Sequence, residues 1–294
     1  MMRIDEAMVR AHLPMAKAID LLDEAFHAWG EGRAGNQPRR RMILPTNAVL
    51  HSMAGYNELY FGTKVYATHP KHGAWFHFLL YDAVTAQPLA LFDANWLGQI
   101  RTGAATGLAT RRLAQVGPAV VAVLGSGFQA RGQLEAVRCV REASRTFVWS
   151  RKRESAERFA DEMGAEVAVS ADEAVSAATI IVTATSAKEP LFDADSVRPG
   201  THVNAVGSNQ AAKRELPAAL FERASAIVAD SIDAARIEAG DLLLGLDEQG
   251  WSRVEELRAG RVRQSAEEIT VFKSVGLGLE DVAVAGYLYE LFRG

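Results

Sequence analysis

The N-terminal third of the chain changes from a helical to a strand-like hydrophobic pattern. Apolar residues between Pro14 and Trp29 recur at helical spacing, and glycines follow directly. From Met42 to Asp93 the pattern becomes short apolar runs separated by turn residues. We therefore predict a helix over 14–29, followed by an antiparallel meander of strands.

The rest of the chain alternates between apolar runs and amphipathic segments. Residues 95–114 form a predicted helix rich in small residues. From residue 117 onward, six apolar runs alternate with helical segments, ITVFKS at 269–274 adds a further strand, and Leu279 to Phe292 form a last amphipathic helix. This order is typical of a doubly wound α/β sheet with parallel strands. We expect a Rossmann domain over 117–274. A discontinuous α+β domain with an antiparallel sheet would comprise residues 1–116, completed by 275–294.

One strand-to-helix corner carries a dinucleotide-binding motif. The run Val120 to Leu124 is followed by Gly125-Ser126-Gly127, Gln129, Ala130 and a helical pattern. Gly125 permits the tight turn, Gly127 lets the backbone approach a pyrophosphate, and Ala130 lets the helix pack on the strand. The helix N-terminus offers free N–H groups to the phosphates. We expect Gly125, Gly127, Gln129 and Ala130 to contact the cofactor.

The end of the next strand favours NADP(H) over NAD(H), although NAD(H) is possible. An acidic residue at this position would bind the ribose 2′-hydroxyl, but the sequence has Ser150 and then Arg151, Lys152 and Arg153. Arg151 and Ser150 are suited to a 2′-phosphate. The alternative is that these cations only begin a solvated helix.

Composition excludes several classes of function. The chain has 294 residues, 49% of them hydrophobic, a net charge of −4 and one cysteine. No disulfide framework, cysteine-based metal site or nucleic-acid footprint follows from this, and we expect no metal. The N-terminus is too charged for a signal peptide and no apolar run reaches spanning length, so we expect a cytoplasmic protein.

Three cations are candidates to hold a substrate carboxylate. Lys64 stands in an apolar strand, where a lysine seldom points inward without a partner; the alternative is the solvent face of an edge strand. Arg101 lies among small residues of a predicted helix. Arg40 has the weaker case, because a polar surface could hold all of Arg39 to Arg41.

Asp230 ends the strand AIVAD, where open α/β sheets bind ligands. A carboxylate there can act as a general acid or base. The alternative is an N-cap for a helix starting at Ser231 or Ile232, and both roles can coexist.

The chain resembles the ornithine cyclodeaminase/mu-crystallin family. The matching segments include QPRR (37–40), FGTKV (61–65), IRTGAATGLAT (100–110), LGSGFQA (124–130), HVNAVGSN (202–209), VADS with EAGD (228–241) and TVFKSVGLGLEDVAVA (270–285). The resemblance implies a homodimer in which Arg40, Lys64 and Arg101 hold the substrate carboxylate. It also implies that Asp230 transfers the proton and that Thr102 and Ser274 contact the cofactor.

The resemblance also separates activities within the family. True ornithine cyclodeaminases place a glutamate near the position of His51, whereas AVLHSMAGY contains none. We therefore expect a reductase or dehydrogenase that moves hydride between nicotinamide and the α-carbon of a small α-imino or α-amino acid, with Lys64 and Asp230 as catalytic residues. A cyclodeaminase is the first alternative. A non-catalytic binding protein like mu-crystallin is the second, although a pure binder has no use for a proton-transfer carboxylate.

Overall fold

The computed structural model describes all 294 residues. The chain divides into two compact units, the first made of Met1–Ala104 and Gly276–Gly294, the second of Ala105–Val275. The division falls inside α3 (Asn95–Leu113), whereas the predicted first boundary, after residue 116, lies beyond that helix. No helix is long and apolar enough to cross a membrane.

The first unit is built on a six-stranded sheet with the order β1-β6-β5-β4-β3-β2. The strands of this sheet are β1 (Met2–Ile4), β2 (Gly35–Ile43), β3 (Val49–Tyr56), β4 (Tyr60–His69), β5 (Gly73–Asp82) and β6 (Pro88–Asp93). Besides the start of α3, the helices of this unit are α1 (Glu6–His12), α2 (Met15–Gly30) and α11 (Gly278–Phe292). The antiparallel meander is confirmed for β2 to β6. β1 adds a parallel edge strand, so the sheet is mixed, and β2 begins well before the predicted start at Met42.

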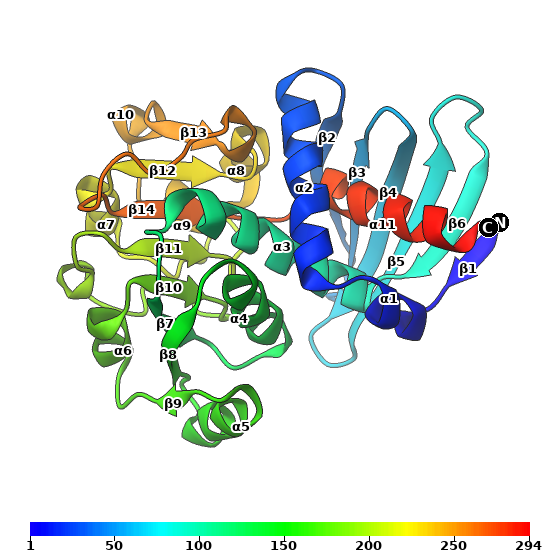
Figure 1. Ribbon diagram of the computed structural model, residues 1–294. Coiled ribbons are helices and arrows are strands. Elements are labelled where there is room, and N and C mark those ends of the chain that lie inside the picture. The colour runs from blue at the N-terminus through cyan, green and yellow to red at the C-terminus, as the bar shows by residue number, and fades with distance from the viewer. The chain divides into compact units, whose positions relative to one another are not determined.

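One face of this sheet is covered by α11, which runs across the strands (Figure 1) and packs on β3 and β4. The contact is close because glycines line it: a Cβ on Gly55 would collide with the backbone of Leu279. Side chains alternate between this covered face and the opposite face along β4, where Lys64 is buried and Val65 is exposed. The alternation therefore decides which side chains can reach the covered face.

The second unit contains an eight-stranded parallel sheet with the order β13-β12-β14-β11-β10-β7-β8-β9. Its strands are β7 (Ala119–Leu124), β8 (Ala143–Trp149), β9 (Glu166–Val167), β10 (Ile180–Thr183), β11 (His202–Ala205), β12 (Ala226–Ala229), β13 (Val254–Glu256) and β14 (Thr270–Lys273). The predicted doubly wound sheet is confirmed, and the unpredicted β13 extends one edge. β14, expected as an added last strand, lies inside the sheet between β11 and β12.

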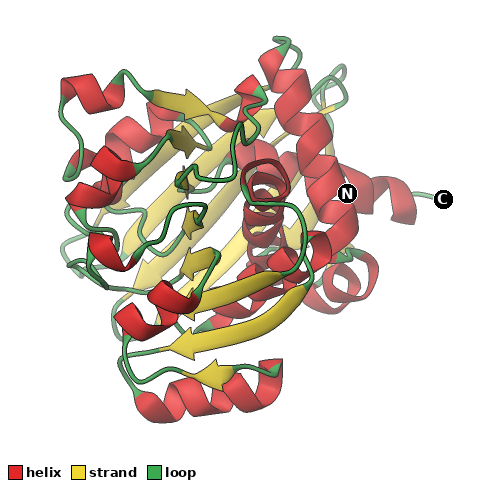
Figure 2. Ribbon diagram, turned by 60° about the vertical axis from the view of Figure 1, so that its left-hand side comes forward, coloured by secondary structure: helices red, strands yellow, loops and turns green.

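Helices connect these strands. They are α4 (Phe128–Val140), α5 (Arg153–Met163), α6 (Ala171–Ala177), α7 (Ala218–Arg223), α8 (Ile232–Glu238), α9 (Gly240–Leu243) and α10 (Glu248–Trp251), with short 3₁₀ turns at Ala194–Ser196 and Leu257–Ala259. The strands β7, β8 and β10 and the helices α4 and α5 share one apolar cluster, which includes Val121, Leu134, Val148 and Phe159. β9 and α5 lie at the lower edge in Figure 2. Because the chain leaves β7 toward β9 and returns to β10 beside β7, the order of strands reverses at β7.

Candidate active site

A pocket of about 510 Å³ lies in the second unit at this reversal of strand order. Its lining comes from the loops after β7, β8 and β10 and the start of α5, namely Gly125–Gln129, Trp149–Lys152, Ser155, Ala184–Ala187 and Leu191. Ligands of open α/β sheets bind at this kind of position. The predicted residues Gly125, Gly127, Gln129, Ser150 and Arg151 all line the pocket, whereas Ala130 is buried behind it.

The glycine corner has the backbone geometry that phosphate binding needs. Gly125 has φ +121°, and a Cβ there would lie 2.5 Å from the carbonyl oxygen of Ala184. Gly127 caps the N-terminus of α4, and a Cβ on it would meet no protein atom within 4 Å. Arg131 braces the corner by donating hydrogen bonds to the carbonyls of Ser126 (2.9 Å) and Gly127 (3.1 Å). The open space at a helix N-terminus fits a dinucleotide pyrophosphate.

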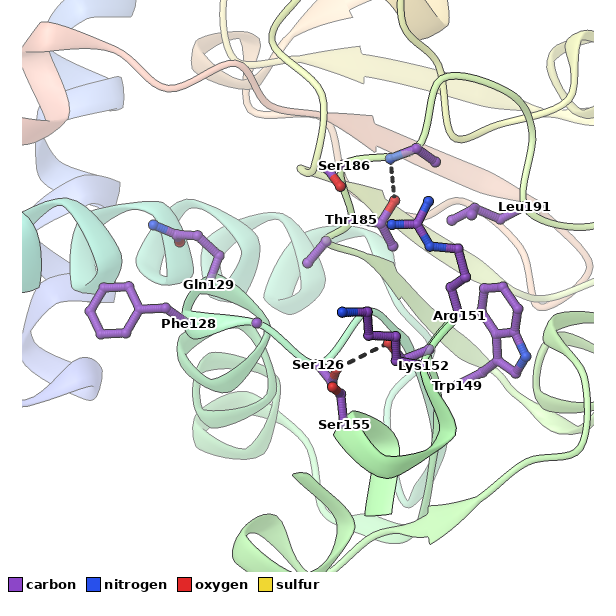
Figure 3. A pocket seen from close by; sticks show the side chains of 15 residues that line it. Ser126, Phe128, Gln129, Trp149, Arg151, Lys152, Ser155, Thr185, Ser186 and Leu191 are labelled. Atoms are coloured by element: carbon purple, nitrogen blue, oxygen red, sulfur yellow. Dashed lines mark hydrogen bonds between the residues drawn. The ribbon is translucent and has the colours of Figure 1, made fainter. Parts of the chain in front are cut away.

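Cations and hydroxyls occupy the part of the pocket that follows β8. Figure 3 shows the side chain of Arg151 extending toward Thr185 and that of Lys152 lying nearer to Ser126 and Ser155. The hydroxyl of Ser150 lies 3.1 Å from that of Ser126 and so links this loop to the glycine corner. No aspartate or glutamate lines the pocket.

Asp230 follows β12 and is fully buried. Its Oδ2 accepts hydrogen bonds from the Ser274 hydroxyl (2.9 Å) and the Val275 amide (2.7 Å), and its Oδ1 accepts one from the Ser231 amide (2.8 Å). The N-cap of α8 is Ser231, whose hydroxyl accepts from Ala234, so Asp230 does not cap that helix. β14 beside β12 explains why Ser274, predicted to contact the cofactor, lies against this carboxylate.

A buried ionic cluster lies beneath α11 in the first unit. Lys64 Nζ is 3.0 Å from Asp281 Oδ1, and Arg101 Nη1 is 2.9 Å from Glu280 Oε2. Both carboxylates are fully buried, and Lys64 and Arg101 are 2% and 6% exposed. Arg101 Nε also lies 3.4 Å from Asp281 Oδ1, so the guanidinium is close to both carboxylates.

The structure brings Arg39 to this cluster, and Arg40 points away from it. Arg39 is buried and its Nη2 lies 3.4 Å from the carbonyl of Gly276, whereas Arg40 is exposed. The β-ladder gives the reason: Arg40 pairs with Ser52, which pairs with Val65 on the uncovered face, while Lys64 pairs with Met53. Arg40 was predicted from the QPRR segment of the family resemblance, and the sequence alone did not show which of the three adjacent arginines is buried. We use "cationic cluster" below for Arg39, Lys64 and Arg101.

Close approach and burial set the charge properties of the cationic cluster. A Cβ on Gly98 would lie 2.6 Å from Lys64 Nζ, so α3 passes directly over the ammonium. Burial lowers the pKa of Lys64 to about 8, Asp281 acts to raise it, and the charges of Arg101 and Arg39 lower it further. Burial also disfavours the charge of Arg101, but Asp281 and Glu280 outweigh this and raise the pKa of Arg101 above its ordinary value.

His51 lies on the same covered face and stays neutral. Its ring stacks on Tyr66 at 4.2 Å between centroids, and its Nε2 is 3.0 Å from the Thr68 hydroxyl. Burial, with Arg41 and Arg39 nearby, lowers the pKa of His51 to about 4. This position therefore offers no negative charge to a second substrate ammonium.

Glu280 and Asp281 were missed from the sequence. The available signal was two adjacent carboxylates at the start of an otherwise largely apolar helix, since nothing else in Gly278–Phe292 is charged before Glu290. Thr102, predicted to contact the cofactor, belongs to the first unit, where its hydroxyl donates to the carbonyl of Gly98 (2.7 Å).

Comparison with known proteins resolves the family. The model of the ornithine cyclodeaminase/mu-crystallin family matches residues 1–294. The chain belongs to this family. The resemblance drawn from the sequence motifs is thereby confirmed.

Relatives within the family are named as reductases. The chain is 40% identical over 227 residues to Δ1-pyrroline-2-carboxylate reductase of Bacillus cereus, covering 72% of this chain and 69% of that protein. It is 37% identical over 224 residues to ketimine reductase mu-crystallin of Mus musculus, covering 75% and 70%. The structure of Thermococcus litoralis Δ1-pyrroline-2-carboxylate reductase with NADH and L-proline matches with a TM-score of 0.92 at 30% identity, covering 99% and 97%.

These relatives confirm the prediction of an oxidoreductase that uses a nicotinamide cofactor. The predicted fold is confirmed by the same structural likeness.

Proposed function

We propose that this protein reduces a small α-imino acid to the corresponding α-amino acid with NADPH. A cyclic ketimine such as pyrroline-2-carboxylate is the favoured substrate, and an open-chain imine of a keto acid is possible. The observation that carries the proposal is the cationic cluster. Lys64 and Arg101 are paired with the buried carboxylates of Asp281 and Glu280, and the charge of the buried Arg39 acts on Lys64, so the group has one net positive charge for one substrate carboxylate.

In this proposal Arg101 and Arg39 orient the substrate carboxylate, and Lys64 adds the third positive charge. Guanidinium groups suit this task because they present several N–H donors in a fixed plane. Arg39 here takes the role that the sequence motif suggested for Arg40. The positive charge of the cluster also makes the neighbouring C=N bond more electrophilic.

Asp230 is proposed to exchange the proton of the substrate nitrogen, directly or through water. The reduced nicotinamide, when bound, supplies the hydride for the α-carbon. Ser274, Val275 and Ser231 hold the carboxylate of Asp230 in one orientation, as positioned general acids and bases require. Because Ser231 already caps α8, the structure gives Asp230 no competing duty as a helix cap.

NADPH is proposed as the preferred cofactor. Arg151, Lys152 and the hydroxyls of Ser150 and Ser155 line one end of a pocket that contains no carboxylate. These groups favour a 2′-phosphate, whereas an NAD site usually offers an acidic residue to the ribose. The backbone amides of the glycine corner would hold the pyrophosphate of either cofactor.

Two family activities are less well supported. A cyclodeaminase acting on ornithine needs a partner for the side-chain ammonium, and the neutral His51 stands near the position where a glutamate is expected. A purely binding role does not account for the buried, fully hydrogen-bonded Asp230.

The deciding assay follows NADPH and NADH absorbance with a panel of imino and amino acids. We expect steady NADPH consumption with pyrroline-2-carboxylate. Release of ammonia from ornithine without net cofactor consumption would overturn the proposal and support a cyclodeaminase.

We also propose a homodimer. The face of the first-unit sheet opposite α11 exposes large apolar side chains, among them Leu50, Val65 and Trp75, and such faces commonly mark contacts between subunits. Light scattering at micromolar concentration should give the mass of a dimer, and a stable, active monomer would contradict this. The expected cytoplasmic location stays a prediction.

A further inference from the structure

A second buried carboxylate, Glu215, lies behind the nucleotide pocket and has no role in the chemistry proposed above. It belongs to the loop between β11 and α7 and is fully buried. Both of its oxygens are saturated by donors. Oε1 accepts from the amide (2.7 Å) and the hydroxyl (2.7 Å) of Thr185, and Oε2 accepts from the Thr183 hydroxyl (2.8 Å) and the Gly207 amide (2.9 Å).

A buried ion pair fixes the loop that carries Glu215. Lys273 Nζ lies 2.8 Å from Asp241 Oδ2 and donates to the carbonyl of Ser208 (2.6 Å). Asp241 Oδ1 in turn accepts from the backbone amides of Glu215 (2.6 Å) and Leu216 (2.9 Å). Burial raises the pKa of the Glu215 carboxyl, and the positive charge of Lys273 opposes that rise. The side chain thus has a fixed backbone and a compensating charge.

The bonds of Glu215 end on one wall of the pocket. Thr185, Ser186, Ala187 and Leu191 all line it. The Thr185 hydroxyl that donates to Glu215 also accepts from the Ala187 amide (3.0 Å), and the Leu191 amide donates to the Glu215 carbonyl (2.9 Å). Figure 3 shows Thr185, Ser186 and Leu191 on this side of the pocket. The carboxylate of Glu215 therefore holds the wall at Thr185 and, through the Thr185 hydroxyl, at Ala187, while its backbone carbonyl holds Leu191.

An ionised carboxylate is the side chain that fits this position. The hydroxyls of Thr183 and Thr185 can rotate to donate or accept, but the amides of Thr185 and Gly207 can only donate. They face different oxygens of Glu215, so a glutamine, which has one oxygen, would leave one of these buried amides opposite an NH₂ group. An unsatisfied buried donor has a substantial energetic cost.

We propose that Glu215 is a positioning residue for the nicotinamide cofactor: it holds the 184–191 segment in the shape that binds the dinucleotide. The inference rests on the proposed binding of NADPH in this pocket. Replacing the carboxylate of Glu215 should therefore raise the Kd of the cofactor. The kcat at saturating cofactor should be preserved, because Glu215 contacts neither the substrate nor the reacting atoms.

The test compares Glu215→Gln with a matched control, Glu268→Gln. Glu268 is another buried glutamate of the second unit that accepts from Arg261 (2.9 Å) and the Gln264 amide (2.7 Å), but it does not line or support the pocket. NADPH Kd is measured by fluorescence titration, melting without cofactor by calorimetry, and kcat and imino acid KM at saturating NADPH. Amide hydrogen exchange over residues 184–191 is followed in the absence of cofactor.

We expect Glu215→Gln to raise the NADPH Kd on the order of tenfold or more, to speed exchange over 184–191, and to leave kcat within about threefold. Glu268→Gln should lower the melting temperature with an unchanged Kd. If Glu215→Gln does not fold, Thr183→Val takes its place in the test. This variant removes one hydrogen-bond donor to Glu215 and lies outside the pocket lining. It should raise the NADPH Kd by about threefold.

Failure of the proposed function and failure of the positioning role of Glu215 give different results. If the wild-type protein binds neither NADPH nor NADH, the proposed function fails. If it binds NADPH and the Glu215→Gln and Thr183→Val variants bind it equally well, the positioning role is overturned and the network is only structural.

Discussion

The cationic cluster of the first unit and the glycine corner of the second unit both suit anions, but they differ in how the positive charge is supplied. The cluster uses buried side-chain charges already paired with Glu280 and Asp281. The corner uses backbone amides at the N-terminus of α4, with side-chain cations only at the rim. Buried charges have a large desolvation cost, which the paired carboxylates offset, whereas helix amides need no such compensation.

This difference gives the two regions different sensitivities. Removing Lys64 or Arg101 takes an ion-pair partner from a buried carboxylate, so stability and substrate binding should fall together. Removing a rim cation of the pocket should affect the cofactor alone.

The largest effect is expected at Asp230, a fully buried carboxyl group of the second unit. Asp230→Asn keeps the size of the side chain but cannot exchange a proton, so kcat should fall by about 10²–10⁴-fold. NADPH binding should change little, but the melting temperature should fall, because the NH₂ group of the asparagine would face one of the backbone amides of Ser231 and Val275, which can only donate. Steady-state rates and calorimetry with and without NADPH measure both. Near-normal turnover with a lowered melting temperature would show that Asp230 is structural.

Arg101→Ala tests the cost of unpairing the cluster. Because Glu280 would lose its 2.9 Å partner while buried, the free energy of unfolding should fall by about 3–5 kcal/mol. The KM of the imino acid should also rise. Denaturant titration measures the first effect, and Arg151→Ala, at the rim of the pocket, is the control that should leave stability unchanged. Equal stability of the two variants would contradict the expected difference between the cationic cluster and the rim of the pocket.

Arg39 and Arg40 are adjacent, but the structure buries Arg39, whereas the sequence motif suggested Arg40. Arg39→Ala should raise the KM of the imino acid by about ten- to a hundredfold through loss of a charge-assisted hydrogen bond. Arg40→Ala should have little effect, since that side chain is exposed on the uncovered face. The reverse pattern in steady-state kinetics would restore the original assignment of Arg40.

The same difference between the two regions explains which site residues could be predicted from the sequence. The glycine corner lies within one strand-turn-helix unit, so local pattern alone identified it. Lys64 and Arg101 were found because a cation is unusual among apolar or small neighbours. Arg39 depends on the register of β2 against β3, with a shift between Gln37 and Arg40, and Glu280 and Asp281 reach the cluster only through the return of α11. Such long-range placements are not encoded in any short segment.

Cofactor selectivity tests the rim of the pocket. Arg151→Ala should weaken NADPH by about ten- to a hundredfold, as expected for a lost hydrogen bond to a charged phosphate. NADH binding should change much less, because that cofactor lacks the 2′-phosphate. Fluorescence titration with both cofactors gives the comparison. A wild-type preference for NADH that Arg151→Ala leaves unchanged would refute NADPH selectivity.

The smallest effect is a pH dependence of the cluster. Since burial lowers the pKa of Lys64 to about 8, the ammonium loses its charge above that pH, and with it the net positive charge of the cluster. Arg101, whose pKa is raised, keeps its charge, and Asp281 stays beside Lys64. We expect kcat/KM to fall above pH 8 by up to about tenfold per pH unit. A Lys64→Arg variant stays charged and should lack this fall; an identical profile would assign it to another group.

The central claim, that hydride passes to the α-carbon of an imino acid, is tested most directly with NADPH carrying two deuterium atoms at C4 of the nicotinamide. The wild-type protein is supplied with this cofactor and pyrroline-2-carboxylate in ordinary water, and the proline formed is analysed by mass spectrometry and NMR. We expect one deuterium per proline, located on the α-carbon. Proline without deuterium at that carbon, or no proline despite bound NADPH, would contradict it.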